Sequence, residues 1–210
     1  MAESTPARYT VGGAGTGSGE VMEWGQVRWT EARQLVAYQG VETEKLPAEG
    51  LAPAQHFAGL RAAGEREDAA EFLALALPRF EAIAWAAHVI EEVADARKLA
   101  GPDRRALDYA LRWLGDPNDE RRRAAFDAAS EASERAPERF LGMAVFFSGG
   151  SISGVDLPPV PPAPELTGKM AGGALTFAAH RAADPGATLD RALDLGEKVA
   201  QQGMQALATR

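Results

Sequence analysis

The 210-residue sequence contains no cysteine and only three histidines. The first absence excludes disulfide bonds and thiolate metal sites, and the second leaves almost no basis for a histidine-rich metal centre. No apolar run approaches the roughly 20 residues of a membrane-spanning helix. Residues 1–20 lack the basic start and apolar stretch of a secretory signal peptide. We therefore expect a cytoplasmic protein that has no cofactor or metal and no membrane partner.

Positive charge is also scarce in this chain. There are 30 acidic side chains against 22 basic ones, which gives a net charge of −8. Proteins that bind nucleic acids need a basic field to neutralise phosphates, so the composition argues against a nucleic-acid partner. Three successive arginines at 121–123 follow Asp119 and Glu120. This mixture of signs predicts a salt-bridged exterior.

Helix-forming sequence is what the chain has in abundance from residue 64 onward. Successive segments open with a proline or with acidic side chains and close near a glycine or proline, as helices usually do. Short breaks between helices imply antiparallel neighbours. We therefore predict an all-α fold, an irregular multi-helix bundle at 64–210. The expected helical segments are 65–77, 78–101, 102–115, 117–136, 137–147, 166–184 and 187–208.

The first 63 residues have a different character. Residues 1–20 are polar and glycine-rich, which predicts a flexible N-terminal extension. Residues 21–63, the aromatic N-terminal segment, carry Trp24, Trp29 and Tyr38 without a strong hydrophobic period. Their pattern is compatible with a short strand at 21–27, a helix at 29–39 and a loop around Pro47 and Pro53.

The sequence offers little for catalysis. Glu91 and Glu92 follow His88 at a spacing that can place an imidazole and a carboxylate on one helical face. A di-iron bundle site, however, needs Glu-x-x-His, and no histidine here has a glutamate three residues before it. The glycine-rich tail lacks the lysine of a phosphate loop, and the serines at 148–153 lack the G-x-S-x-G order. We predict that the protein is not an enzyme. The alternative is an enzyme or toxin-like effector that uses His88 or His180 with nearby carboxylates.

Residues 148–165 interrupt the helices, and we call them the strap. Five prolines at 158, 159, 161, 162 and 164 stiffen it toward the polyproline II conformation. We predict a rigid connection across the end of the bundle, with Leu157 and Val160 as apolar anchors. PxxP spacings occur, but no basic residue adjoins them as an SH3-type ligand would favour. A partner-binding site is the alternative role for this loop.

Three segments carry a resemblance to a known family. They are EAIAWAAHVIEE, PNDERRRAAFDAASEA and AVFFSGGSISGVDLPPVPPAPELTGKMAGGALTFAA. In this order they resemble a bacterial family, domain of unknown function 6931, over about residues 64–200. Its hallmark is an A-F-(W/F)-S-G-G-S segment, a proline strap and a leucine-threonine helix start. The matching positions are Phe147, Ser148, Gly149, Gly150, Ser151, Leu157, Pro158, Pro159, Val160, Pro161, Pro162, Leu166 and Thr167. The chain departs at Phe147, where members often have tryptophan.

The resemblance implies no established activity. It implies an association with type VI secretion-like gene clusters, and hence an accessory, adaptor or chaperone role. We therefore expect a non-enzymatic helical adaptor that binds a partner protein, in a type VI or other contractile secretion assembly. An acidic immunity-type inhibitor is a further alternative. Aromatic and apolar anchors dominate interface energies, so the expected protein-binding residues are Phe146, Phe147, Leu157, Val160, Trp24, Trp29 and Tyr38; the alternative is that the aromatic ones fill the protein's own core.

Overall fold

The computed structural model describes residues 23–208 except 41, 96–97, 100 and 155. The predicted tail at 1–20 lies outside the described residues. The described residues form nine α-helices and two short 3-10 helices and include no strand, which confirms the all-α prediction. Residues 23–27 of the expected strand form a turn instead. The first elements are α1 (Ala32–Tyr38), η1 (Thr43–Lys45), α2 (Pro53–Ala63) and α3 (Arg66–Ala76).

The prediction of a loop around Pro53 is wrong, because Pro53 begins α2. A proline at the first helical position lacks only an N–H that has no partner within the helix, and its fixed φ suits the helix. The remaining elements follow the predicted order. They are α4 (Arg79–Asp95), α5 (Gly101–Gly115), α6 (Asp119–Glu131), α7 (Pro137–Phe147), α8 (Leu166–Arg181), α9 (Pro185–Gln202) and η2 (Gly203–Leu207).

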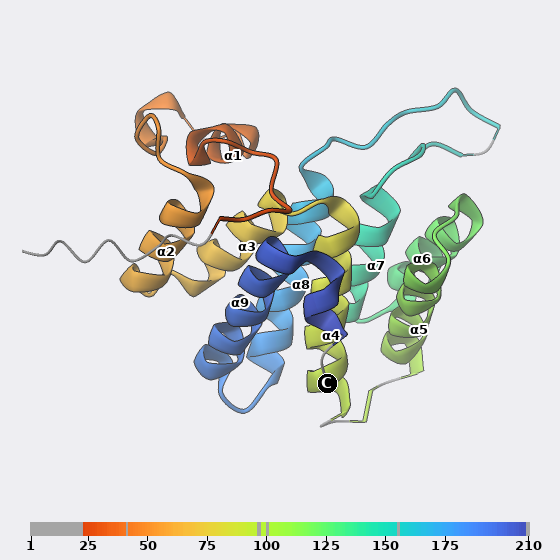
Figure 1. Ribbon diagram of the computed structural model, residues 1–210. Coiled ribbons are helices and arrows are strands. Elements are labelled where there is room, and N and C mark those ends of the chain that lie inside the picture. The colour runs from red at the N-terminus through yellow and green to blue at the C-terminus, as the bar shows by residue number, and fades with distance from the viewer. Residues whose placement is uncertain (1–22, 41, 96–97, 100, 155, 209–210) are drawn as a thin grey trace, which may run out of the picture.

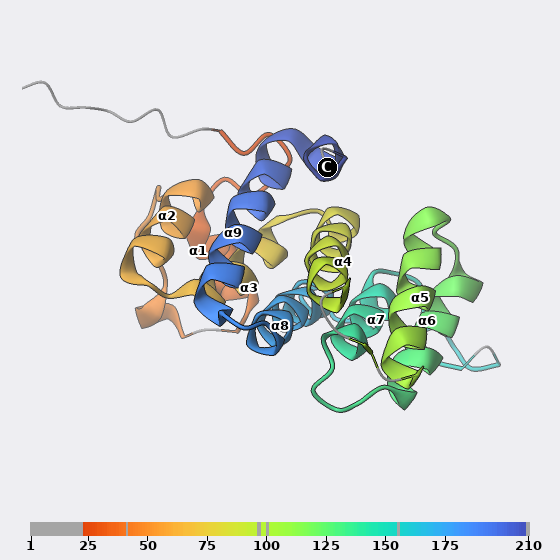
Figure 2. The ribbon, with the colours of Figure 1, turned by 90° about the horizontal axis from the view of Figure 1, so that it is seen from below.

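Helix α8 lies at the centre of the bundle. It packs against α3, α4, α7 and α9, and the antiparallel pair α5 and α6 packs against α7. Seen from below, α1 and α2 lie on one side of α8, and α5 and α6 lie on the other (Figure 2). Among the described residues, no helix is both long enough and apolar enough to span a bilayer.

Glycines let α8 approach α3 closely. A Cβ atom added to Gly168 would lie 2.7 Å from Leu75 Cδ2, and one added to Gly172 would lie 2.8 Å from Glu71 Cα. Carbon atoms do not pack at such distances, so these helices can touch only through bare backbone. Gly172 therefore lies at the close contact, while a Cβ on Gly173 would meet only the Phe140 ring, at 3.3 Å.

The strap joins α7 to α8 but does not lie across the bundle. Figure 1 shows it standing out beyond the ends of the helices. Leu157 is 63% exposed and Val160 is 47% exposed, so the prediction that they anchor the strap to the bundle is wrong. Of the five prolines in the strap, Pro162 is buried and the other four are exposed. The physical reason is that polar contacts from α6, described next, hold the loop in place of apolar burial.

Candidate partner-binding site

Two arginines of α6 converge on one carboxylate below the strap. Asn118 caps the helix by accepting a hydrogen bond from the Arg121 N–H at 2.9 Å. Asp119 therefore stands in the first turn, and Arg122 and Arg123 follow it at three and four residues, where side chains meet on one face. Arg122 Nη2 lies 2.7 Å from Asp119 Oδ1, and Arg123 Nε lies 2.9 Å from Oδ2.

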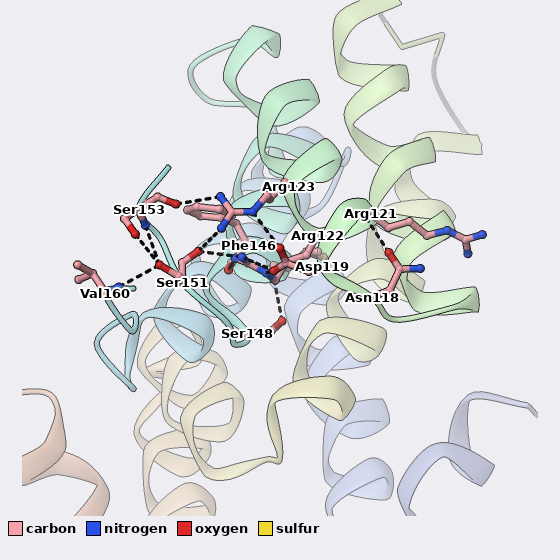
Figure 3. A network of polar contacts seen from close by, with 11 residues as sticks. Asn118, Asp119, Arg121, Arg122, Arg123, Phe146, Ser148, Ser151, Ser153 and Val160 are labelled. Atoms are coloured by element: carbon pink, nitrogen blue, oxygen red, sulfur yellow. Dashed lines mark hydrogen bonds and ion pairs between the residues drawn. The ribbon is translucent and has the colours of Figure 1, made fainter. Parts of the chain in front are cut away.

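The same guanidinium groups hold the backbone of the strap (Figure 3). Arg122 donates to Phe146 O at 2.6 Å and to Ser151 O at 2.8 Å. Arg123 donates to Ser151 O at 3.1 Å and to Ser153 O at 3.0 Å. Arg122 is only 4% exposed, so the prediction of a salt-bridged exterior at 121–123 is wrong for this residue. Its buried charge is tolerated because carbonyl groups and a carboxylate replace water.

The electrostatics of this cluster favour the ionised state of Asp119. Hydrogen bonds from Arg122 and Arg123 hold the pKa of the Asp119 carboxyl below its usual value. A carboxyl whose pKa is depressed by folding adds stability at neutral pH, and this contribution is lost as pH falls through the folded-state pKa. Asp119 is therefore ionised at neutral pH, where it can accept hydrogen bonds from both arginines.

A second set of hydrogen bonds joins the two arms of the strap. Ile152 N donates to Val160 O at 2.8 Å, and Val160 N donates to Ser151 Oγ at 2.9 Å. Ser153 Oγ donates to Pro158 O at 2.7 Å. These contacts, together with the arginines below, give the loop one defined shape although it stands away from the helices.

Apolar side chains gather on this loop. The large hydrophobic residues that are exposed in the described part of the chain are Tyr38, Ile152, Leu157, Val160 and Met204, and three of the five belong to the strap. Pro158, Pro159, Pro161 and Pro164 are exposed beside them. Contiguous exposed apolar surface is typical of a contact site, whereas a single exposed apolar residue is not.

The two phenylalanines predicted as contacts lie below this surface. Phe146 is 6% exposed and stacks on Phe126 with 4.2 Å between ring centroids. The Arg122 guanidinium covers its ring at 4.8 Å. Phe147 is half-buried against Phe146, with 5.5 Å between the ring centroids. Both rings therefore support the base of the strap, and Phe146 offers no surface to a partner.

The aromatic N-terminal segment does not join the strap. Trp24 is 6% exposed and packs edge-on against Phe57 at 5.2 Å, so it belongs to the core. Trp29 is half-buried and packs against Tyr38 at 5.5 Å. Only Tyr38 of these three is exposed, and α1, which carries it, lies away from the outer tip of the strap in both views (Figures 1 and 2). The predicted contact residues therefore form two separate groups.

The histidines named for the alternative hypothesis also lie apart. His180 Nε2 is 2.8 Å from Glu67 Oε1, beside a cavity of about 390 Å³, but both side chains are more than half exposed. His88 Nε2 is 3.7 Å from Glu92 Oε1, which is too long for a hydrogen bond. In the part of the chain that the structure describes, no group of histidine, aspartate and glutamate side chains could hold a metal ion.

The third histidine, His56, lies in a polar cavity that sequence reasoning missed. His56 and Glu71 line a cavity of about 180 Å³ with Asp68 and Gln39. Burial lowers the pKa of His56 and raises the pKa of Glu71. Gln39 Nε2 donates to Glu71 Oε1 at 3.3 Å. No sequence motif marks this cavity, because its members come from three helices.

Sequence reasoning also missed the arginines that hold the strap. The available signal was the spacing of Asp119, Arg122 and Arg123, which places one carboxylate within reach of two guanidinium groups. That spacing does not show that both arginines also donate to carbonyls about 30 residues further along the chain. The charge pattern alone could not separate a surface ion pair from a buried anchor.

The structure thus defines an all-helical protein whose most distinctive surface is an ordered, outward loop between α7 and α8. A family model described as a family of unknown function, DUF6931, matches residues 56–200, which is more than half of the chain. The chain belongs to this family, as the resemblance at 64–200 implied. The match includes the whole strap and α6, and leaves out α1. No curated protein and no solved structure matches the chain.

Proposed function

We propose that this protein is a non-enzymatic helical adaptor that binds a partner protein through the strap. One observation carries the proposal: Ile152, Leu157 and Val160 are held in solvent by a loop that buried arginine contacts keep ordered. Ordering backbone costs about 1–2 kcal/mol per residue, and here little apolar burial offsets that cost. A rigid apolar loop favours binding, because the loop loses little further conformational entropy when a partner binds it.

The proposed partner belongs to a type VI or other contractile secretion assembly, as the family resemblance implies, and the proposed compartment is the cytoplasm. The net charge of −8 supports a protein partner over a nucleic acid. The predicted contact residues have different roles in this proposal. Leu157 and Val160 provide the contact, Phe147 supports it from below, and Phe146 and Trp24 serve the core.

The test uses the full chain expressed in its own host with an affinity tag. Proteins that co-purify with it are compared with those recovered by a Leu157→Asp, Val160→Asp variant, and the partner is then purified and titrated by calorimetry. The control is Met204→Asp, which places one of these two charges at an exposed apolar residue away from the strap. All of these side chains are exposed, so thermal unfolding should confirm that the variants fold.

The expected result is a stoichiometric partner that binds the wild type and the Met204→Asp control equally. The strap variant should bind at least about tenfold more weakly, which corresponds to a loss of about 1.4 kcal/mol. Equal binding by the strap variant would overturn the proposal. A basic partner that ignores the strap substitutions and dissociates at high salt would instead support the immunity-type inhibitor.

A further inference from the structure

We infer that the strap is a preformed polyproline II ligand and that its partner presents an aromatic-lined groove with a basic rim. This inference rests on the proposed function, because it specifies the partner surface that the strap would contact.

The covalent structure of the strap restricts its backbone. In residues 157–164, each position is a proline or directly precedes a proline. Proline fixes its own φ near −65°, and the residue before a proline is kept out of the helical region by the proline ring. The residues that precede a proline are therefore kept extended, and the stretch favours polyproline II geometry up to Ala163. Pro164 lies in the turn that Leu166 N closes on Ala163 O at 3.1 Å. The hydrogen bonds at Val160 tie this stretch to the other arm of the strap.

Polyproline II has three residues per turn, so this stretch has three edges. Leu157, Val160 and Ala163 share the first edge, and all three are exposed. The prolines at 158, 161 and 164 share the second edge, and these are exposed as well. The third edge holds Pro159, which is exposed, and Pro162, which is buried. The third edge therefore turns toward the fold at Pro162, whereas every described residue of the other two edges is exposed.

The two presented edges together form three apolar–proline pairs. These pairs, Leu157-Pro158, Val160-Pro161 and Ala163-Pro164, repeat once per turn. Aromatic-lined grooves bind such segments, because flat rings pack against proline and the segment has already lost its conformational freedom. Addition of the strap to a sheet edge is excluded, since prolines lack the N–H groups that a strand must donate.

Charge selects the rim of that groove. Asp156 directly precedes the stretch and is exposed, while Glu165 follows it and is half-buried. The sequence has no lysine or arginine between Arg139 and Lys169. The arginines beneath the strap are occupied by Asp119 and by carbonyl groups. A groove with lysine or arginine at its rim therefore complements the strap, whereas an SH3-type groove favours a basic residue beside the prolines.

The experiment places a photo-cross-linking residue in the full chain by an Ala163→p-benzoylphenylalanine substitution, which leaves all five prolines in place. After irradiation in the host, mass spectrometry identifies the cross-linked residues of the partner. We expect them in a groove that contains tryptophan, tyrosine or phenylalanine, with lysine or arginine at its edge. The partner identified by the cross-link is then purified on its own, without cross-linking, and is titrated against the full chain by calorimetry.

The affinity series separates the edges of the strap. Pro161→Ala removes one presented proline and should weaken binding by about tenfold. Pro159→Ala, on the third edge, is the matched control and should weaken it by less than about threefold. Asp156→Lys should weaken binding by about tenfold, and added salt should weaken wild-type binding.

The outcomes distinguish this inference from the proposed function. Cross-links to a surface without aromatic side chains, or to a second copy of this chain, overturn the inference. Equal effects of Pro159→Ala and Pro161→Ala overturn it too, while the Leu157→Asp, Val160→Asp variant still tests the adaptor role. If that variant binds as tightly as the wild type, both proposals fail.

Discussion

Arg122 shows how one side chain can determine the position of a whole loop. Its guanidinium is nearly fully buried, contacts the Phe146 ring on one face and donates to two carbonyl oxygens and one carboxylate. Five N–H donors in a planar fork make arginine suited to this role, and lysine offers no comparable geometry. Arg122 therefore fixes the base of the strap, while Ser151 and Ser153 join its two arms.

We predict that Arg122→Met lowers the free energy of unfolding by about 2 kcal/mol, because charge-assisted hydrogen bonds to Phe146 O and Ser151 O are lost. Arg122→Lys should recover only part of this loss. Urea denaturation followed by circular dichroism measures both. The control is Arg121→Met, at a half-exposed neighbour whose guanidinium pairs with Asp116 at 3.0 Å and donates to Arg112 O at 3.1 Å; it should lower stability by less than about 1 kcal/mol. Equal losses at 121 and 122 would contradict the anchoring role.

His56 links stability to pH. Burial lowers its pKa in the folded state, and the charge of Glu65 opposes this shift only in part. The unfolded chain therefore binds a proton at His56 more readily, so stability is full above the usual histidine pKa of about 6.5 and falls as pH drops below it.

For His56→Gln, we predict a shallower fall in the free energy of unfolding between pH 7.5 and 5.5. One proton contributes at most about 1.4 kcal/mol per pH unit to this slope. Glu71 lines the same cavity, and burial raises its pKa, so its contribution to stability changes with pH in the opposite direction; Glu71 is present in both proteins, so the comparison isolates His56. Denaturation midpoints measured at half-unit pH steps provide the test, and an unchanged slope in the variant would contradict the prediction.

At the scale of elements, the local sequence pattern predicted most of the helices but not the position of the strap. The helices between residues 65 and 202 were predictable, since caps, breaks and apolar spacing act within a few residues. The strap was predictable as an extended segment for the same reason. Its position was not, because its anchors on α6 lie about 30 residues earlier in the chain. Pro53 could mark either a loop or a helix start, and only the packing of α2 decided between them.

The contact between α4 and α9 depends on Gly196. A Cβ atom there would lie 2.5 Å from Trp85 Cζ2 and 2.8 Å from Leu73 Cδ2. Trp85 is fully buried and donates from Nε1 to Ala192 O at 2.9 Å, so the ring has no room to move aside. The two helices therefore pack with an indole ring against bare backbone.

Gly196→Ala should accordingly destabilise the protein by about 1–3 kcal/mol through overpacking. Gly59→Ala is the matched control, because Gly59 lies within α2 with no atom near its missing side chain. There the substitution should stabilise the protein by up to about 1 kcal/mol through helix propensity. Thermal and urea unfolding of the pair provide the measurement, and shifts of the same sign would contradict the close contact.

At the scale of the molecule, stability should decrease from the centre outward. Helix α8 is surrounded by α3, α4, α7 and α9, whereas the seven residues of α1 pack mainly on α2 and α3. The sequence could not show this order, since most of the helices are alanine-rich and similarly apolar. It also could not show that Trp24 and Phe146 are core residues, because an aromatic side chain suits a core and an interface equally.

Hydrogen exchange should reveal this order. Amides in the middle of α8 should exchange only through global unfolding, and those of α1 through local opening, with at least about a hundredfold less protection. Exchange followed by mass spectrometry, on peptides covering each helix, would measure the difference. Peptides from α1 that stay protected as long as those from α8 would contradict a stable centre with a looser edge.

The strap has a consequence for the survival of the protein in the cell. Proteases usually cut folded chains at long exposed loops. Trypsin-like enzymes find no lysine or arginine from residue 140 to residue 168, and the apolar residues Leu157, Val160 and Ala163 each precede a proline. A proline after the cleaved bond lacks the N–H and the free φ that a protease needs to bind the chain. The bonds after Leu157, Val160 and Ala163 are therefore poor substrates for proteases that cleave after apolar residues, although these residues lie in solvent.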